Sequence, residues 1–161
     1  MSRTILSIDV GFGNTKAVWS DPGARDFGPT GEICFSSVVP ACHVPALEKA
    51  SGLGGGALDR VVVEVDGRHF FVGLEATLGD GARILDPNFI ERPEYRALIA
   101  GALHYFMRAT GHVSQSVDAL VLGLPVSAFA TKRAALKAVG GRVHRVPVPK
   151  ALQGRTGRDT I

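Results

Sequence analysis

The residues with the clearest potential for chemistry form one short cluster near the start of the chain. In order they are Asp9, Gly11, Phe12, Gly13, Asn14, Thr15 and Lys16. A carboxylate such as Asp9 suits hydrated Mg²⁺, which takes one or two carboxylates and completes its shell with water and phosphate oxygens. Lys16 adds a point charge for phosphate oxygens, and the glycines leave backbone N–H groups uncovered for a close approach. The cluster therefore has the composition of a site for a phosphate and its metal ion.

The same cluster also has the composition of a plain structural turn. Runs rich in Ile, Leu, Val and Trp flank it at residues 5–10 and 14–19, and such residues favour strands. Glycine and asparagine supply the positive φ angles that a tight connection needs. A β-hairpin is thus predicted over residues 5–19, and the residue types alone leave both a phosphate cradle and a bare hairpin open.

The middle of the chain predicts three further elements. An extended segment covers residues 32–40 and ends at a proline. Asp66-Gly67, between two β-rich runs, predicts a second hairpin over residues 60–73. Apolar residues at intervals of three and four, after a proline at position 93, predict a helix that ends at Gly111.

The last part of the chain predicts another strand and another helix. A nearly continuous apolar run at 117–126 is typical of a strand buried on both faces, and residues 129–139 read as a helix. From position 142 alternating valines suggest a strand, and the following Pro-, Gly- and Arg-rich residues are expected to form a frayed basic tail. Two hairpin-linked strands, a third strand and then helix–strand–helix indicate an α/β fold. We expect a mixed sheet with flanking helices in the ribonuclease-H-like arrangement.

The composition fits one globular domain in a reducing compartment. The 161 residues are 45% hydrophobic and 20% charged, which is ordinary for a domain that buries a core. The chain opens without the apolar stretch of a signal peptide, and it has no apolar run of about 20 residues, as a membrane helix needs. Cys34 and Cys42 lack metal-ligand spacing and are expected as thiols. We therefore expect a cytoplasmic protein without membrane contact. The net charge of +3 is too modest to predict direct nucleic-acid binding.

The phosphate-type cluster belongs to a longer resemblance. The string IDVGFGNTKAVW, with its D-x-G-x-x-N/T-x-K pattern, resembles the first phosphate loop of the actin, sugar kinase and heat-shock chaperone superfamily. It is most similar to bacterial actin-like ATPases of the ParM/StbA plasmid-segregation type, including the PRTRC-system protein D group. FSSVVP, DGRHFFVG, EYRALIAGAL and LVLGLPVS follow in that family's order. The resemblance implies the N-terminal half of such a protein. Its core would span 1–36 and 93–145, with an inserted small β-rich subdomain at about 37–92 and a basic Pro/Gly-rich tail at 146–161.

The resemblance also implies a function. ATP and Mg²⁺ would be the cofactors, with Asp9 organising the metal shell, Lys16 contacting phosphate and the other loop residues closing over the phosphates. Self-association into filaments is implied, together with an adaptor protein bound to plasmid DNA. The family carries a glutamate just after the strand at 117–126 to position the attacking water, whereas this chain has Ser127 and Ala128 there. No catalytic residue is therefore assigned.

Three functions remain open. The family builds its ATP site between two similar halves, and nothing after Gly141 resembles the second phosphate loop. The chain is therefore expected to be an ATP-binding domain related to filament proteins, and whether it acts as an enzyme is left undecided. A small-molecule kinase of the same superfamily, of the sugar or pantothenate type, is the second reading. It would need a mid-chain catalytic aspartate, and the local pattern around Asp118 does not match such a site. The third reading is a non-catalytic module that binds or caps a full-length relative.

Overall fold

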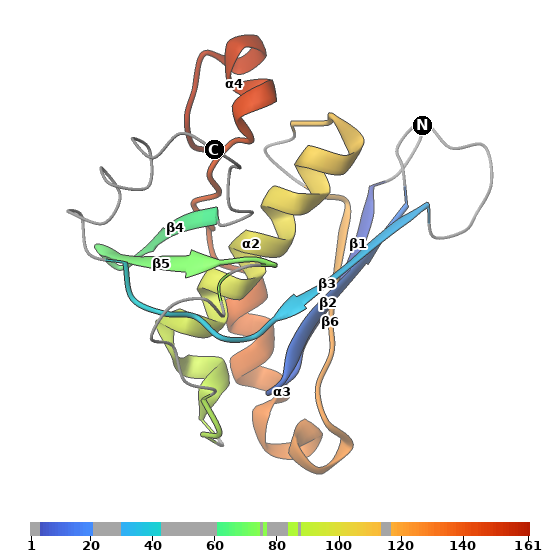
Figure 1. Cartoon of the computed structure of the whole chain (residues 1–161). Helices are drawn as coiled ribbons and strands as arrows, with labels where there is room; N and C mark the ends of the chain where they lie inside the picture. The colour runs from blue at the N-terminus through green and yellow to red at the C-terminus, as the bar shows by residue number, and fades with distance from the viewer. Residues whose placement is uncertain are drawn as a thin grey trace.

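The computed structural model describes residues 4–20, 30–42, 61–74, 76, 84–86, 88–113 and 117–161. Its main sheet has the strand order β3-β2-β1-β6 (Figure 1). These strands are β1 (Ile5–Val10), β2 (Asn14–Trp19), β3 (Gly31–Ser36) and β6 (Ala119–Leu122). β1 pairs antiparallel with β2 and parallel with β6, and β2 pairs antiparallel with β3. The mixed α/β sheet predicted from the sequence is confirmed.

The register of β1 and β2 divides their residues between two faces. Successive side chains of a strand point to opposite faces, so Ile8 and its partner Ala17 are buried on the core face. Asp9 and its partner Lys16 stand one position along, on the exposed face. The alternation of apolar and polar residues in β1 therefore decides which side of the sheet carries the charges.

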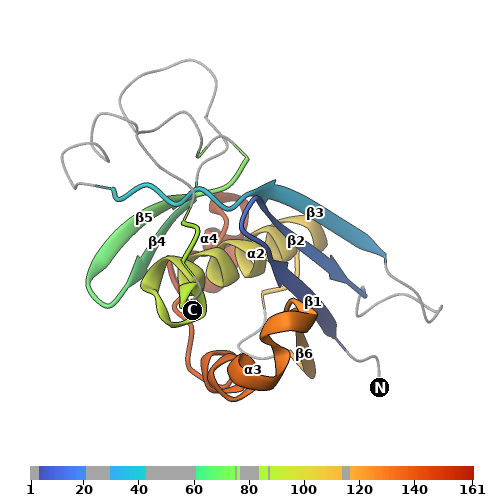
Figure 2. The same cartoon turned by 90° about the horizontal axis from the view of Figure 1, so that it is seen from below.

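Helix α2 (Pro93–Thr110) forms the centre of the core. It lies between the main sheet and the hairpin of β4 (Val61–Val65) and β5 (Arg68–Val72), as Figure 2 shows. Pro93 occupies its first turn, where a missing N–H costs nothing, and Gly111 ends it in the left-handed conformation at φ 66°. Both ends agree with the prediction.

Aromatic contacts join α2 to the main sheet. The Trp19 ring meets Phe106 edge-on at 5.9 Å between centroids, and Phe35 packs on Tyr105 at 5.4 Å. Such pairs add a little to the free energy gained by burying their area. The predicted apolar stripe is therefore the surface that joins the sheet to the hairpin.

The β4–β5 hairpin turns at Asp66-Gly67, as predicted. Both residues have positive φ, 53° and 72°, which is the conformation of a two-residue hairpin turn. Arg96 of α2 forms a two-pronged ion pair with Asp66. The chain after β3 runs beside β5, because Phe71 donates its backbone N–H to Pro40 at 2.9 Å. Much of the predicted subdomain at about 37–92 lies outside the described residues, so its limits stay a prediction.

The prediction that the strand at 117–126 is buried on both faces is wrong. β6 lies at the edge of the main sheet, and Val121 on its outer face is 52% exposed. Only the other face, with Leu120 and Leu122, packs against the core. An apolar run matches a buried strand in composition, but one sequence does not show how many elements cover it. The helix that follows, α3 (Val126–Gly140), begins three residues earlier than expected, directly after Pro125.

The expected frayed tail is ordered in the structure. Val146, Val148 and Leu152 are buried and join the core cluster. Val146 and Ile161 exchange backbone hydrogen bonds of 2.8 and 3.0 Å, and the short helix α4 (Lys150–Thr156) lies between them. The segment folds because its few apolar residues join the core and because His104 of α2 hydrogen-bonds the Pro147 carbonyl at 2.6 Å. Composition does not show these tertiary contacts. Among the described helices, none combines the length and apolarity of a membrane span.

Two glycines in helices provide a test of this packing. A Cβ at Gly101 in α2 would overlap the Val72 side chain, whereas a Cβ at Gly154 in α4 would meet nothing within 4 Å. Gly101→Ala should lower the free energy of unfolding by about 1–3 kcal/mol through overpacking. Gly154→Ala should leave it unchanged or raise it by up to about 1 kcal/mol. Urea unfolding followed by the fluorescence of Trp19 measures both, and equal effects would contradict the packing of α2 on β5.

Candidate functional site

The β1–β2 turn is built from backbone hydrogen bonds. The Gly11 N–H donates to the Asn14 carbonyl at 3.1 Å, and the Gly13 carbonyl accepts from the Ser37 N–H at 3.1 Å. A Cβ at Gly11 would lie 3.1 Å from the Asn14 oxygen, which is tighter than ordinary contact, whereas Gly13 faces open space. Gly11 thus allows a close backbone approach within the turn, and Gly13 leaves its side of the loop uncovered. The prediction of positive φ angles in this turn is wrong, because Gly11, Gly13 and Asn14 all have negative φ.

Asp9 and Lys16 stand beside this turn on the exposed face of the sheet. They are directly opposite partners on β1 and β2, so their side chains leave the sheet on the same side. The structure therefore brings together the carboxylate and the amine that the sequence singled out, next to the open side of the loop.

The end of β6 lies beside Asp9 and, with the ends of β1 and β2, forms one corner of the sheet. Because β1 and β6 are parallel, their carboxyl ends meet at one edge of the sheet, where ligands of open α/β sheets bind. The Gly123 N–H donates to the Ile8 carbonyl at 3.0 Å. A Cβ at Gly123 would lie 2.8 Å from Oδ1 of Asp9. Any residue other than glycine would therefore displace this carboxylate. The sequence analysis did not single out Gly123, since its neighbour on β1 is more than a hundred residues away.

Helix α3 starts at the same edge. Its first turn contains Ser127 and Ala128, and the Ala128 N–H donates to the Pro125 carbonyl at 2.9 Å. The N-terminus of a helix carries a partial positive charge. Neither Ser127 nor Ala128 has a carboxylate or amide group that could orient a water molecule.

Thr15 is the predicted site residue whose side chain lies away from the others. It is fully buried, and its hydroxyl shares a 2.9 Å hydrogen bond with the hydroxyl of Ser37, which is also buried. The pair joins β2 to the end of β3 beneath the loop. Removing one hydroxyl would leave the other unsatisfied, which costs about 1–3 kcal/mol in a buried site. The Thr15 hydroxyl therefore supports the loop from the core side.

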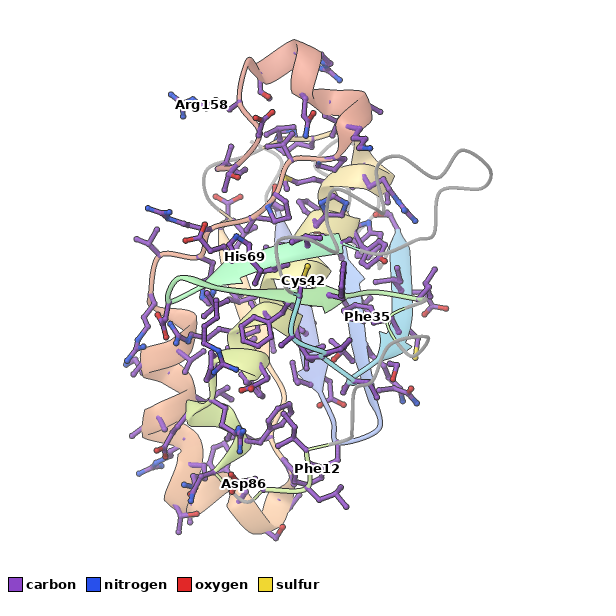
Figure 3. The ribbon with its side chains drawn as sticks, turned by 60° about the vertical axis from the view of Figure 1, so that its left-hand side comes forward. Phe12, Phe35, Cys42, His69, Asp86 and Arg158 are labelled. Atoms are coloured by element: carbon purple, nitrogen blue, oxygen red, sulfur yellow. The ribbon has the colours of Figure 1, made fainter. Side chains whose placement is uncertain are left out.

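Phe12 links the loop to the start of α2. Its ring stacks on Phe89 at 6.2 Å, and Phe89 lies in the short helix η2 (Phe89–Glu91). Figure 3 shows Phe12 at the same end of the molecule as Asp86, just before η2. Lys132 of α3 donates to Asn88 at 2.6 Å and to Glu91 at 3.1 Å. The loop, η2 and α3 thus form one contiguous set of contacts.

Tyr95, in the first turn of α2, is connected to the loop through Phe89. Its side chain is 1% exposed and meets Phe89 edge-on at 5.5 Å. The Tyr95 hydroxyl is buried and has no hydrogen-bond partner among the described residues. Burial, and then the negative charge of Asp9, raise the pKa of Tyr95 to about 12, so the phenol keeps its proton at neutral pH. The helical spacing identified Tyr95 as a core residue, and its burial confirms this prediction.

The corner at Asp9 fits an Mg²⁺-bound phosphate on two structural grounds. The Gly123 position makes room for the Asp9 carboxylate, and Lys16 leaves the sheet on the same side as that carboxylate. Among the described residues no three His, Cys, Asp or Glu side chains form a cluster, and Mg²⁺ bound through a carboxylate and phosphate oxygens does not require one.

Asp118, the mid-chain aspartate considered for the kinase reading, lies elsewhere. Its carboxylate accepts the Thr4 backbone N–H at 2.7 Å, at the start of β1, whereas Asp9 lies near its end. This contact ties the start of β1 to the start of β6 and gives Asp118 a structural role.

Comparison with solved structures identifies the same fold. The apo psk41 ParM protein superposes with a TM-score of 0.62 at 12% identity over 91% of this chain. A ParM filament from Clostridium botulinum gives 0.60 at 21% identity over 86%, and an archaeal actin homologue gives 0.54 at 23% over 84%. The chain spans 44%, 39% and 37% of these three chains, respectively, which is less than half of each. No curated protein matches the chain.

A family profile described as "Actin like proteins N terminal domain" matches residues 7–156, almost the whole chain. This range includes the β1–β2 turn and Gly123, so the family match and the candidate site coincide. The chain therefore belongs to the family of actin-like N-terminal domains.

Proposed function

We propose that this chain is the phosphate- and Mg²⁺-binding domain of an actin-like protein of the ParM plasmid-segregation type. The observation that carries the proposal is the cross-strand pair of Asp9 and Lys16 beside the glycine turn, with Gly123 against the carboxylate. A negative and a positive group on one sheet face suit a metal ion and the phosphate it neutralises. The ligand would be Mg·ATP.

Each residue has a distinct part in this proposal. Asp9 would hold the water shell of Mg²⁺, while Lys16 and the side chain of Asn14 would contact phosphate oxygens. The backbone N–H groups beside Gly13 would complete the cradle. ATP supplies a phosphoanhydride bond for hydrolysis. Because Ala128 has no group to orient water, we propose binding and assign no hydrolytic residue.

Self-association is the second part of the proposal. One structural relative is described as a 15-stranded ParM filament and another as a non-polymerisable ParM mutant. In this chain Val126 is 93% exposed, and Phe129 and Val121 are more than half exposed, all on α3 and β6. Exposed apolar groups gathered in one region favour contact with another protein surface. An adaptor protein on plasmid DNA and a cytoplasmic location are proposed from the family type alone.

A non-catalytic capping module is the alternative that a specific observation favours. Ala128 stands where a glutamate is expected, and the β6–α3 surface is apolar, so the chain could bind a full-length relative without turning over ATP. The kinase reading has no such support, because the Asp118 carboxylate accepts a backbone N–H.

Binding of Mg·ATP tests the proposal directly. We expect calorimetry to give a dissociation constant of about 1 mM or lower, which corresponds to about −4 kcal/mol. Asp9→Asn and Lys16→Met should each weaken binding at least about tenfold, because each removes a charge that faces the ligand. Both side chains are exposed, so thermal unfolding of the free protein should be unchanged.

Two matched controls accompany these variants. Glu32→Gln neutralises another carboxylate of the main sheet, at the register position opposite Val18 on the exposed face. Lys150→Met removes an exposed lysine from α4. Both should bind Mg·ATP as the wild type does. An absence of heat with millimolar Mg·ATP, or equal losses in all four variants, would contradict the proposed site.

Gly123→Ala tests the role of Asp9 in holding the metal. The new Cβ would lie 2.8 Å from Oδ1 and push the carboxylate aside. Affinity for ATP should fall about tenfold in the presence of Mg²⁺, equivalent to about 1.4 kcal/mol. With the metal removed by EDTA, affinity should match that of the wild type. A loss of the same size with and without Mg²⁺ would show that the substitution disturbs the fold and not the metal site.

Light scattering tests self-association. Adding Mg·ATP to the protein at tens of micromolar should raise the scattered intensity, and Asp9→Asn should remove the ATP-dependent part because it removes the proposed metal ligand. A flat trace for the wild type would count against filament formation by this chain.

A further inference from the structure

We propose that a pocket remote from Asp9 binds a small amphipathic anion: a carboxylate on an apolar chain, of which a medium-chain fatty acid is the simplest form. The pocket lies between the C-terminal half of α2, β6, the end of α3 and the residues that follow α3. Figure 3 shows Arg158, one of its lining residues, at the opposite end of the molecule from Phe12. The site is therefore separate from the phosphate corner, and the inference goes beyond the proposed function.

The floor of the pocket is apolar. Its volume is about 520 Å³, which lies within the range of small-molecule sites. The apolar lining comes from several elements and includes Leu103, Phe106 and Met107 of α2, Leu120 of β6, and Val146. Phe106, Met107 and Val146 belong to the buried core, so this wall exists before any ligand arrives. An apolar chain laid against it would leave water, which is favourable.

Two arginines stand at the edge of this apolar surface. Arg142 and Arg158 line the pocket and are exposed. No carboxylate among the described residues forms an ion pair with either of them. A guanidinium binds a carboxylate through two parallel N–H donors. The pocket thus combines an apolar floor with cations that suit a carboxylate head group.

A neighbouring pocket provides an internal comparison. Glu64, Asp66, Arg96 and Arg145 line it, and there each arginine has an acidic partner. Arg96 bonds to Asp66, and Arg145 lies 3.7 Å from Glu64. The hydrogen bond from Arg96, and more weakly the charge of Arg142, lower the pKa of Asp66. The cations of that pocket are therefore neutralised within the fold, whereas those of the proposed site face it without a paired carboxylate.

The charge of the surrounding segment has the sign that an anionic ligand needs. Residues 142–161 contain five lysines and arginines and one aspartate, whereas the net charge of the whole chain is +3. Such a concentration of positive charge attracts anions. His144, which also lines the pocket, donates from Nε2 to the Val139 carbonyl at 3.0 Å. Burial lowers the pKa of His144, so its ring stays neutral and holds the pocket wall to the end of α3.

Calorimetric titration with octanoate, decanoate and octan-1-ol tests the class of ligand. We expect saturable one-to-one binding of both acids. Decanoate should bind about fourfold or more tightly than octanoate, because each buried methylene adds affinity. Octan-1-ol has the same chain length as octanoate without the charge, and should bind at least about fivefold more weakly than octanoate.

Four variants test the position of the site. Val143 lines the pocket and is 97% exposed, so Val143→Asp should weaken octanoate binding at least about fivefold by charge repulsion and leave octan-1-ol binding within about twofold. Arg142→Gln and Arg158→Gln should each weaken binding of decanoate at least about threefold. The control is Arg133→Gln, which removes an exposed arginine of α3 outside the lining and should bind as the wild type does. All four side chains are exposed, so thermal unfolding should be unchanged.

Three results would overturn the inference. They are an absence of saturable binding at millimolar decanoate, equal affinity for octanoate and octan-1-ol, and a loss in Arg133→Gln as large as those in Arg142→Gln and Arg158→Gln. Asp9→Asn should bind decanoate as the wild type does. A failure of the phosphate site therefore leaves this inference standing, and a failure of this inference leaves the phosphate site untouched.

Discussion

The position of β1 between β2 and β6 is the constraint on which the rest of the structure depends. Leu6 and Ile8 are fully buried against α2, and the side-chain period of two then forces Asp9 onto the opposite face. A slip of one residue in register would reverse this choice and place the carboxylate in the core. The hydrophobic pattern of a few residues thus fixes where the charge stands. Parallel pairing with β6 then places Gly123 beside it.

The loop is joined to the helices by side-chain contacts as well as by the chain. Phe12 packs on Phe89, and Lys132 of α3 bonds to residues on both sides of that phenylalanine. Because these contacts are contiguous, a displacement of Phe12 would also change the contacts of η2 with Lys132 of α3.

The sequence predicted the features that depend on local chemistry. The positive φ values at Asp66 and Gly67, and the end of α2 at Gly111, follow from residue types at single positions. The first hairpin follows from strand-forming runs on both sides of a glycine-containing turn. The family resemblance was confirmed because its motifs are also local strings.

The features that the sequence did not predict all arise from contacts between distant residues. Gly123 matters because β6 lies beside β1, and Thr15 bonds with Ser37 because β3 returns along β2. The tail is ordered because Val146 and Leu152 join the hydrophobic core. One chain read alone gives the type of each residue and not the identity of its neighbours.

The central claim is that the corner formed by β1, β2 and β6 holds a metal-bound phosphate. Mn²⁺ replaces Mg²⁺ in sites of oxygen ligands, and its unpaired electrons broaden the NMR signals of nearby amides. With sub-stoichiometric Mn·ATP, the amides of residues 9–16 and of Gly123 should broaden most, and those of α4 should stay sharp. Broadening concentrated elsewhere, or no selective broadening at millimolar ATP, would contradict the account.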